Sequence, residues 1–152
     1  MGLYDWNEMS PEEISVLYRR KTARGENITV ARVEILKWAV TQPHSHDSEE
    51  VIIVLKGAWK FSLPDGDVVL RANQMLQIPP GVEHSSEVLE DTVAFDICAP
   101  GRTDWLAGED RLLHQDPDET VGRLDPAVAQ TLVCMQYVIR GMTQNRLKSL
   151  CY

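Results

Sequence analysis

The chain has few cysteines, and nothing in their spacing pairs them. Cys98, Cys134 and Cys151 are odd in number and far apart, and no C-x-x-C pair occurs. This spacing argues against a disulfide framework and against a thiolate zinc site. A reducing compartment suits such a chain best, so we expect a cytoplasmic protein.

Long basic runs and long apolar runs are also missing. The formal net charge is −8 at pH 7, with acidic residues interleaved among basic ones. That balance argues against nucleic acid or an anionic membrane surface as the main partner, although one pocket can still be positive enough for an anionic small molecule. No segment approaches the roughly 20 apolar residues of a membrane span, and residues 1–13 carry acids where a signal peptide needs a basic start.

A chain of 152 residues with 43% hydrophobic content is large enough for one domain with one core. Its patterns change along the sequence, and we divide it accordingly. The expected parts are an N-terminal arm with a short helix (1–28), a β-barrel (29–100), an irregular connection (101–125) and a C-terminal amphipathic helix (126–150).

The two helices are expected from their start signals. Ser10-Pro11-Glu12-Glu13 has the order of a capping box, which predicts a short helix from Pro11 to about Arg20. Asp125-Pro126 has the form of a cap and first helical position. The apolar residues that follow recur on one stripe: Val128, Leu132, Met135, Ile139 and Met142. The stripe packs on the barrel or pairs with another subunit, unless this terminal segment is disordered.

Between these helices the apolar residues recur with the period of strands. Thr29–Lys37 alternates apolar with charged residues, as a strand with one wet face does. Further short runs are rich in apolar and β-branched residues: Glu50–Leu55, Ala58–Leu63, Val68–Arg71, Met75–Ile78 and Thr92–Cys98. Pro64–Asp67 predicts a hairpin turn, with Gly66 supplying a positive φ. The spacing indicates an all-β barrel or sandwich.

Three of the four histidines fall in a pattern that suits metal binding. His44, His46 and Glu50 share one parity of an extended chain, so their side chains can converge, whereas Glu49 should face away. His84 follows the turn of Pro79-Pro80-Gly81. Three imidazoles and a carboxylate suit one divalent transition metal, namely Fe²⁺, Mn²⁺, Ni²⁺, Co²⁺, Zn²⁺ or Cu²⁺. His114 stands apart, and we expect no role for it.

These two segments resemble the motifs of the cupin superfamily, G(x)5HxH(x)3–4E(x)6G and G(x)5PxG(x)2H(x)3N. The first is met at the ligands and at Gly57, with Trp38 in place of its opening glycine. The second is met at Pro79, Gly81 and His84, with Asn73 and Val88 in place of its opening glycine and closing asparagine. The resemblance, over Thr29 to Pro100, implies a jelly-roll barrel (a double-stranded β-helix) that holds one metal ion at its open end. It also implies a homodimer, because small cupin barrels commonly pair.

Asp96 and Arg102 are the candidate catalytic residues. By parity Asp96 shares a face with Ala94 and Cys98, so it is either a solubilising residue at the barrel mouth or an acid or base aimed at a substrate. Arg102 can hold a carboxylate with two parallel hydrogen bonds, or lie on the surface. The stretch around them is similar to the pectin-degradation cupins that open unsaturated uronates, whose D-x-F-x-P-x-R-x-D pattern is met except that Cys98 replaces the aromatic residue. Their fourth ligand is commonly glutamine, where this chain has Glu50.

Three functions remain open at this point. The first is metal-assisted isomerisation or ring opening of a small carboxylate or sugar acid, with Asp96 moving a proton and Arg102 holding the carboxylate. The second is a metal-dependent oxygenase like quercetin dioxygenase. The third is a cupin that binds a small molecule without catalysis. The metal ligands do not choose among them, because cupins share this site across many reactions.

Overall fold

The structure is a computed structural model, and it describes residues 1–107, without the side chains of the last two. These residues belong to one compact unit, Met1–His114. The elements are β1 (Glu12–Ser15), β2 (Tyr18–Arg24), β3 (Thr29–Ile35), β4 (Val40–His44), β5 (Glu49–Leu63), β6 (Gly66–Arg71), β7 (Met75–Ile78), β8 (His84–Ala99) and α1 (Asp104–Ala107). Among these residues no helix is long and apolar enough to cross a membrane. The expected helix over 126–150, its apolar stripe and His114 lie outside the described residues.

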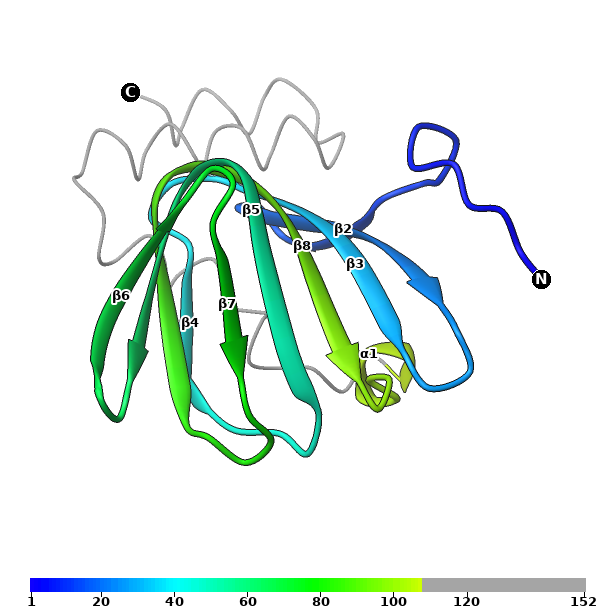
Figure 1. Cartoon of the computed structure of the whole chain (residues 1–152). Coiled ribbons are helices and arrows are strands. Elements are labelled where there is room, and N and C mark those ends of the chain that lie inside the picture. Colours follow the sequence, from blue (N-terminus) through cyan, green and yellow to red (C-terminus); the bar gives the residue numbers. More distant parts are fainter. Residues whose placement is uncertain (108–152) are drawn as a thin grey trace, which may run out of the picture. The chain divides into compact units, whose positions relative to one another are not determined.

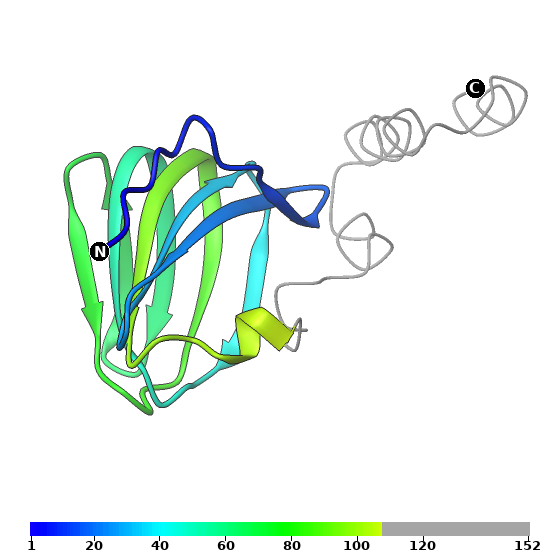
Figure 2. The ribbon, with the colours of Figure 1, turned by 90° about the vertical axis from the view of Figure 1, so that its right-hand side faces the viewer.

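Two long strands, β5 and β8, organise the fold. They pair antiparallel along nearly their whole length, from Glu49 opposite Ala99 to Ser62 opposite Ser85. One half of this pair continues through β3, β2 and β1 on one side and β7 on the other, while the other half is flanked by β4 and β6. The strands therefore fold over as two layers around a shared interior (Figures 1 and 2). The expected all-β barrel is confirmed.

The bend in β5 needs a glycine. Gly57 has a φ of 89°, and a Cβ at this position would lie 2.3 Å from the Asp91 carbonyl oxygen and 2.7 Å from the Thr92 hydroxyl oxygen. The pairing with β8 shifts register between Val54 and Trp59. The sequence predicts separate strands over 50–55 and 58–63, and the structure joins them through this bulge into one bent strand.

Two other positions have left-handed backbone without being glycine. The φ angles are 72° at Trp38 and 67° at Asn73, the two positions where the cupin motifs open with glycine. Asparagine tolerates this conformation, but for a bulky residue it costs on the order of 1–2 kcal/mol. Trp38 is held there by the hydrogen bond that its N–H donates to the Val88 carbonyl, at 2.9 Å.

The prediction of an N-terminal helix from Pro11 to Arg20 is wrong. That segment forms β1 and β2, a hairpin in which Glu12 lies opposite Arg20, and β2 pairs with β3 over seven residues. The edge of β3 offers unpaired backbone groups, and pairing with them outweighs a local capping signal. Tyr18 and Arg20 face inward while Arg19 faces outward, a period-2 alternation that the capping box concealed.

The interior between the layers has two unlike halves. Near the bend it is apolar and buried, lined by Val33, Ile35, Val54, Trp59, Leu70 and Val88. Near the other end it contains buried polar and ionisable groups: Thr29, Ser48, Glu50, His84, Asp96 and Cys98. We call these the apolar half and the polar half. Every candidate site residue that is buried belongs to the polar half.

Candidate metal centre

Three histidines converge in the polar half. His44 ends β4 and lies opposite His84, which begins β8, and their ring centroids are 4.3 Å apart. His46 follows in the loop, where its carbonyl accepts a hydrogen bond from the N–H of Gly81 at 2.8 Å. One ring nitrogen from each of the three lies within 4.8 Å of the others. Parity predicted that His44 and His46 converge, and His84 was added because it follows the turn at Gly81. That turn has a φ of 75° and links the two motif loops.

Each of the three imidazoles has its orientation fixed by the backbone. The Nδ1 atoms of His44, His46 and His84 are 2.9 Å from the carbonyl oxygens of Gln42, Ser48 and Val82 respectively. A carbonyl oxygen only accepts hydrogen bonds, so each Nδ1 carries the proton. In the neutral ring, Nε2 then keeps a lone pair that can bind a metal ion. Histidines that bind a metal ordinarily donate a hydrogen bond from their other ring nitrogen in this way.

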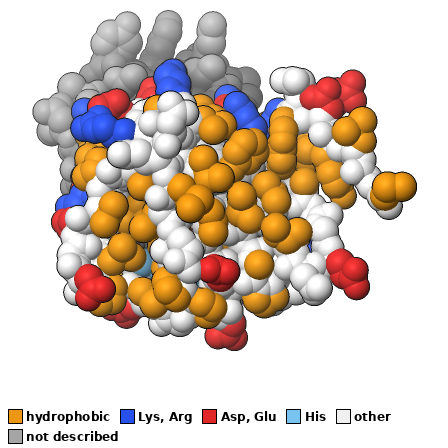
Figure 3. Space-filling model, viewed as in Figure 1, with side chains coloured by type: hydrophobic (Ala, Val, Ile, Leu, Met, Phe, Trp, Pro, Cys, Tyr) orange, Lys and Arg blue, Asp and Glu red, His pale blue; other side chains and the backbone are white. Residues whose placement is uncertain are grey.

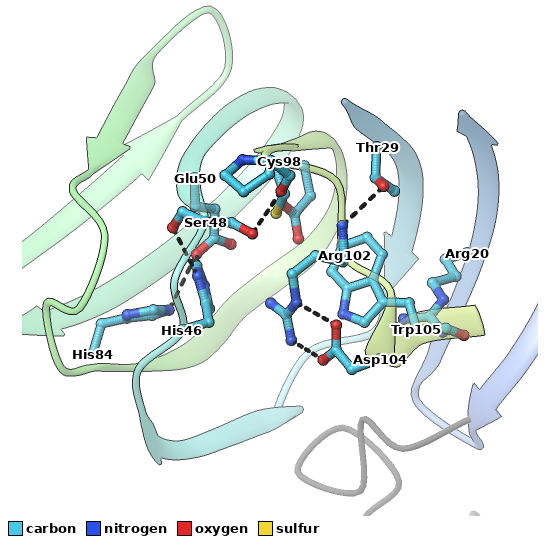
Figure 4. A network of polar contacts seen from close by, with 12 residues as sticks. Arg20, Thr29, His46, Ser48, Glu50, His84, Cys98, Arg102, Asp104 and Trp105 are labelled. Carbon is cyan, nitrogen blue, oxygen red and sulfur yellow. Dashed lines mark hydrogen bonds and ion pairs between the residues drawn. The ribbon is translucent and has the colours of Figure 1, made fainter. Parts of the chain in front are cut away.

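Glu50 lies beside the three histidines and directs a carboxylate oxygen at two of them. Its Oε2 lies 3.1 Å from Nε2 of His46 and 3.1 Å from Nε2 of His84 (Figure 4). In a neutral ring with its proton on Nδ1, Nε2 has only a lone pair to present to the Glu50 carboxylate. Each of the two contacts of Glu50 therefore needs a cation between the atoms, either a proton or a metal ion. Donors bound at right angles about 2.1 Å from one ion are about 3 Å apart, so the distances from Glu50 to His46 and to His84 fit donors of a single metal. Glu49 faces outward, where its side chain accepts a hydrogen bond from Gln77.

The ionisation of the cluster follows from burial and from its own contacts. Burial alone raises the pKa of Glu50, but hydrogen bonds from His46 and His84 outweigh it and lower that pKa to about 2. Burial lowers the pKa of His44. Burial also acts to lower the pKa of His84. Its hydrogen bonds to Glu50 and to the Val82 carbonyl outweigh burial, so the pKa of His84 is raised. The cluster therefore contains a carboxylate that stays ionised beside neutral or protonated imidazoles.

Asp96 lies inside the barrel and next to this cluster. It is 5% exposed and sits opposite Ile52 in the pairing of β5 with β8. Burial, followed by the negative charge of Glu50, raises the pKa of Asp96 well above its usual range. Cys98, on the same face, points its thiol at Asp96 Oδ1 at 3.6 Å, and burial raises the pKa of that thiol too. Of the two readings of Asp96, a solubilising residue at the mouth does not fit this burial.

Arg102 lies at the edge of the polar half, just beyond β8. Its side chain is 12% exposed and makes two hydrogen bonds to Asp104, at 2.8 Å and 2.5 Å. Its positive charge acts to lower the pKa values of Asp96, Cys98 and His84, which places it within electrostatic reach of the cluster. Arg102 is thus not a free surface residue.

Sequence reasoning missed the residues that surround Arg102. Its guanidinium lies 5.0 Å from the ring of Trp105 in α1, and Arg20 of β2 lies 4.7 Å from the same ring. Trp105 belongs to the described part of the expected irregular connection, which forms one helical turn there. Arg20 was assigned to a helix. The available signal was the inward parity of Arg20 on a strand, which requires the strand to be recognised first.

Comparisons with known proteins agree with the geometry. A model of the cupin domain matches residues 31–98. KdgF from Halomonas sp. is 22% identical, with a TM-score of 0.65 over 68% of this chain and 99% of that chain. An RmlC-like cupin from Shewanella frigidimarina is 20% identical, with a TM-score of 0.65 over 69% and 96%. Ectoine synthase from P. lautus is 10% identical, with a TM-score of 0.64 over 72% and 86%.

None of the curated proteins matches the chain. At these identities the solved structures show the fold alone. That fold and the domain match both agree with the two histidine motifs. Residues 31–98 match the cupin domain, and the described chain has the cupin jelly-roll fold.

Proposed function

We propose that the chain binds one divalent transition metal ion through His44, His46, Glu50 and His84. We also propose that it uses the ion to isomerise, or open the ring of, a small carboxylate or sugar acid. The observation that carries this is the convergence of three Nε2 atoms whose Nδ1 atoms all bond to backbone carbonyls. Nitrogen donors with one carboxylate suit Fe²⁺, Mn²⁺, Ni²⁺, Co²⁺, Zn²⁺ or Cu²⁺.

The residues beside the cluster supply the remaining chemistry of this proposal. When bound, the metal polarises substrate oxygens and stabilises the negative charge that develops on them. Asp96 sits within the same buried half and gives or takes the proton, and Arg102 pairs with the substrate carboxylate. The pattern at Asp96, Pro100, Arg102 and Asp104 supports a uronate-like substrate, since it resembles the pectin-degradation cupins. KdgF from Halomonas sp. is among the similar structures.

The test begins with the metal. Protein purified without an affinity tag is analysed for bound metals beside the His84→Ala variant. We expect one transition metal ion per chain in the wild type and almost none in the variant, because the variant lacks one of the four proposed ligands. Equal metal content in the two proteins contradicts the proposed site.

The reaction class is tested on the metal-loaded protein. Turnover of an unsaturated uronate without oxygen uptake supports the proposal. Turnover that consumes oxygen identifies the oxygenase instead. Tight binding of the acid with no turnover identifies a binding cupin.

The expected homodimer and cytoplasmic location belong to the same proposal. Hydrophobic side chains gather on the outer face of β5 and β8, where Phe95 and Ile97 are only half-buried and Met75 of β7 is 62% exposed (Figure 3). An apolar face of this kind is typical of a surface that pairs. Light scattering is expected to give twice the chain mass, and Met75→Lys to shift it toward the monomer. Cys98 is a free buried thiol, which suits a reducing compartment.

A further inference from the structure

The guanidinium of Arg102 is held on several sides before any ligand is present. Asp104 accepts from its Nε and one Nη, and the face of Trp105 lies against it. The backbone is fixed as well, because the N–H of Arg102 donates to the Thr29 hydroxyl at 3.0 Å and its carbonyl accepts from Arg24 at 2.8 Å. A guanidinium has five N–H donors, so three remain for a ligand after Asp104 has taken two.

Trp105 is in turn held by Arg20 from the other side. Figure 4 shows the indole between the two arginines, with Arg20 at 4.7 Å from the ring centroid. An Nη of Arg20 also lies 3.5 Å from the Trp105 carbonyl oxygen, and its Nε donates to Glu12 at 2.8 Å. The side chain of Arg20 is fully buried. A row of contacts thus runs from Glu12 through Arg20 and Trp105 to Arg102.

This row is a costly way to fill space. A buried arginine loses its hydration, and an apolar side chain of similar volume at position 20 would pack without that loss. Glu12, Arg20 and Trp105 also lie outside residues 31–98, the part matched by the cupin domain. The row ends on Arg102, whose positive charge acts on Asp96, Cys98 and His84. A functional role of Arg102 that requires a fixed guanidinium explains why this row of contacts exists.

We propose that Arg20 and Trp105 are positioning residues that hold the guanidinium of Arg102 ready for a carboxylate. The N-terminal hairpin β1–β2 then becomes part of the site, joined to it through the indole of Trp105. Fixing a long side chain only when the ligand arrives lowers affinity by about threefold to tenfold, and the row removes that penalty beforehand. The carboxylate ligand rests on the proposed function, whereas the positioning of Arg102 does not.

The first measurement is independent of any ligand. The Nε–H resonance of Arg102 in the full chain, assigned by its absence in Arg102→Ala, reports the order of the guanidinium. We expect a protected, ordered Nε–H in the wild type and in Trp105→Phe. Order should fall in Trp105→Ala and in Arg20→Met, which keeps an unbranched apolar stem but removes the guanidinium. Arg19→Ala, on the outer side of β2, is the matched control. Unchanged order in both Trp105→Ala and Arg20→Met overturns the proposal, and either variant suffices if the other does not fold.

The second measurement uses D-galacturonate as a carboxylate probe for the metal-loaded protein. We expect Trp105→Ala to weaken its binding about threefold to tenfold with metal content unchanged, and to have no further effect in an Arg102→Ala background. An equal loss in that background means a structural role only and overturns the proposal. If the wild type binds no uronate, or Arg102→Ala binds it as well as the wild type, the proposed substrate class fails. The resonance measurement then still decides whether Arg102 is positioned.

Discussion

The two halves of the barrel interior are both buried, but the buried ionisable side chains of the candidate site lie in the polar half. In the apolar half, residues such as Ile35, Val54 and Val88 are at most 2% exposed and pack on one another. Burying each of them contributes roughly 1.5–3 kcal/mol. In the polar half, Glu50 and Asp96 are 7% and 5% exposed, and a buried charge costs free energy unless it is paired. Stability is therefore expected to come from one half and chemistry from the other.

The largest effect should separate chemistry from stability at Asp96. We expect Asp96→Asn to lower turnover by about 10²–10⁴, the usual contribution of a positioned acid or base. Because the amide is close in shape to a protonated carboxyl, metal content and the unfolding midpoint should change little. The measurements are kcat, bound metal and urea unfolding on the same preparation. Activity that survives in Asp96→Asn but disappears without oxygen contradicts the proton-transfer role and selects the oxygenase.

A substitution in the apolar half should have the opposite outcome, a loss of stability. Ile35→Ala should lower the free energy of unfolding by about 2–5 kcal/mol, because a buried cavity replaces the lost side chain. Leu36→Ala is the matched control, since Leu36 is the next residue and is 44% exposed, so we expect about 0.5 kcal/mol or less. Urea unfolding is measured on chelated protein, so that bound metal does not add to stability. A folded Ile35→Ala that loses metal without losing stability breaks the division between the halves.

The contrast between the halves also explains how much the sequence could predict. Parity along an extended chain is a local property, and it predicted that His44, His46 and Glu50 share one face, while it left two positions open for Asp96. The glycines of the two turns were recognisable because a positive φ has few other solutions. Strand limits were less accurate where β5 bends, since the bulge at Gly57 depends on contact with Asp91 and Thr92 of another strand.

The N-terminal hairpin could not be predicted from local signals. A capping box measures the preference of a few residues, while β2 exists because β3 has an edge to pair with, and that edge is known only from the fold. The same holds for Arg20 and Trp105, which are 85 residues apart in the chain and meet in space. Trp38 stands where the motif opens with glycine, and the structure gives it the left-handed backbone of the glycine that it replaces.

A smaller effect is expected at this tryptophan. Trp38 lies between β3 and β4, beside the apolar half, with a φ of 72° and 41% of its surface exposed. Trp38→Gly should be more stable than Trp38→Ala by about 1 kcal/mol, because only glycine adopts this φ without strain. Comparing the two variants removes the shared loss of the indole and its contact with Lys37. Equal unfolding midpoints for the two variants would mean that the backbone changes conformation there.

The smallest effect concerns a charge on the outer face of the barrel, where neither half is involved. Glu34 of β3 pairs with Arg32 and Arg19, and their hydrogen bonds, Arg32 first, lower its pKa below 4.5. A lowered folded pKa means that the pairing stabilises the protein above pH 4.5, and that this stability is lost as pH falls through the folded pKa. At pH 7 we expect Glu34→Gln to be about 0.5 kcal/mol less stable than the wild type, as for other exposed ion pairs. The difference should be smaller in high salt.

Glu26→Gln, in the exposed turn between β2 and β3, changes the net charge equally and is the control. The difference in unfolding free energy between Glu34→Gln and Glu26→Gln should shrink as the pH is lowered below 4.5. A difference that stays constant with pH would assign the effect of Glu34 to packing rather than to its charge.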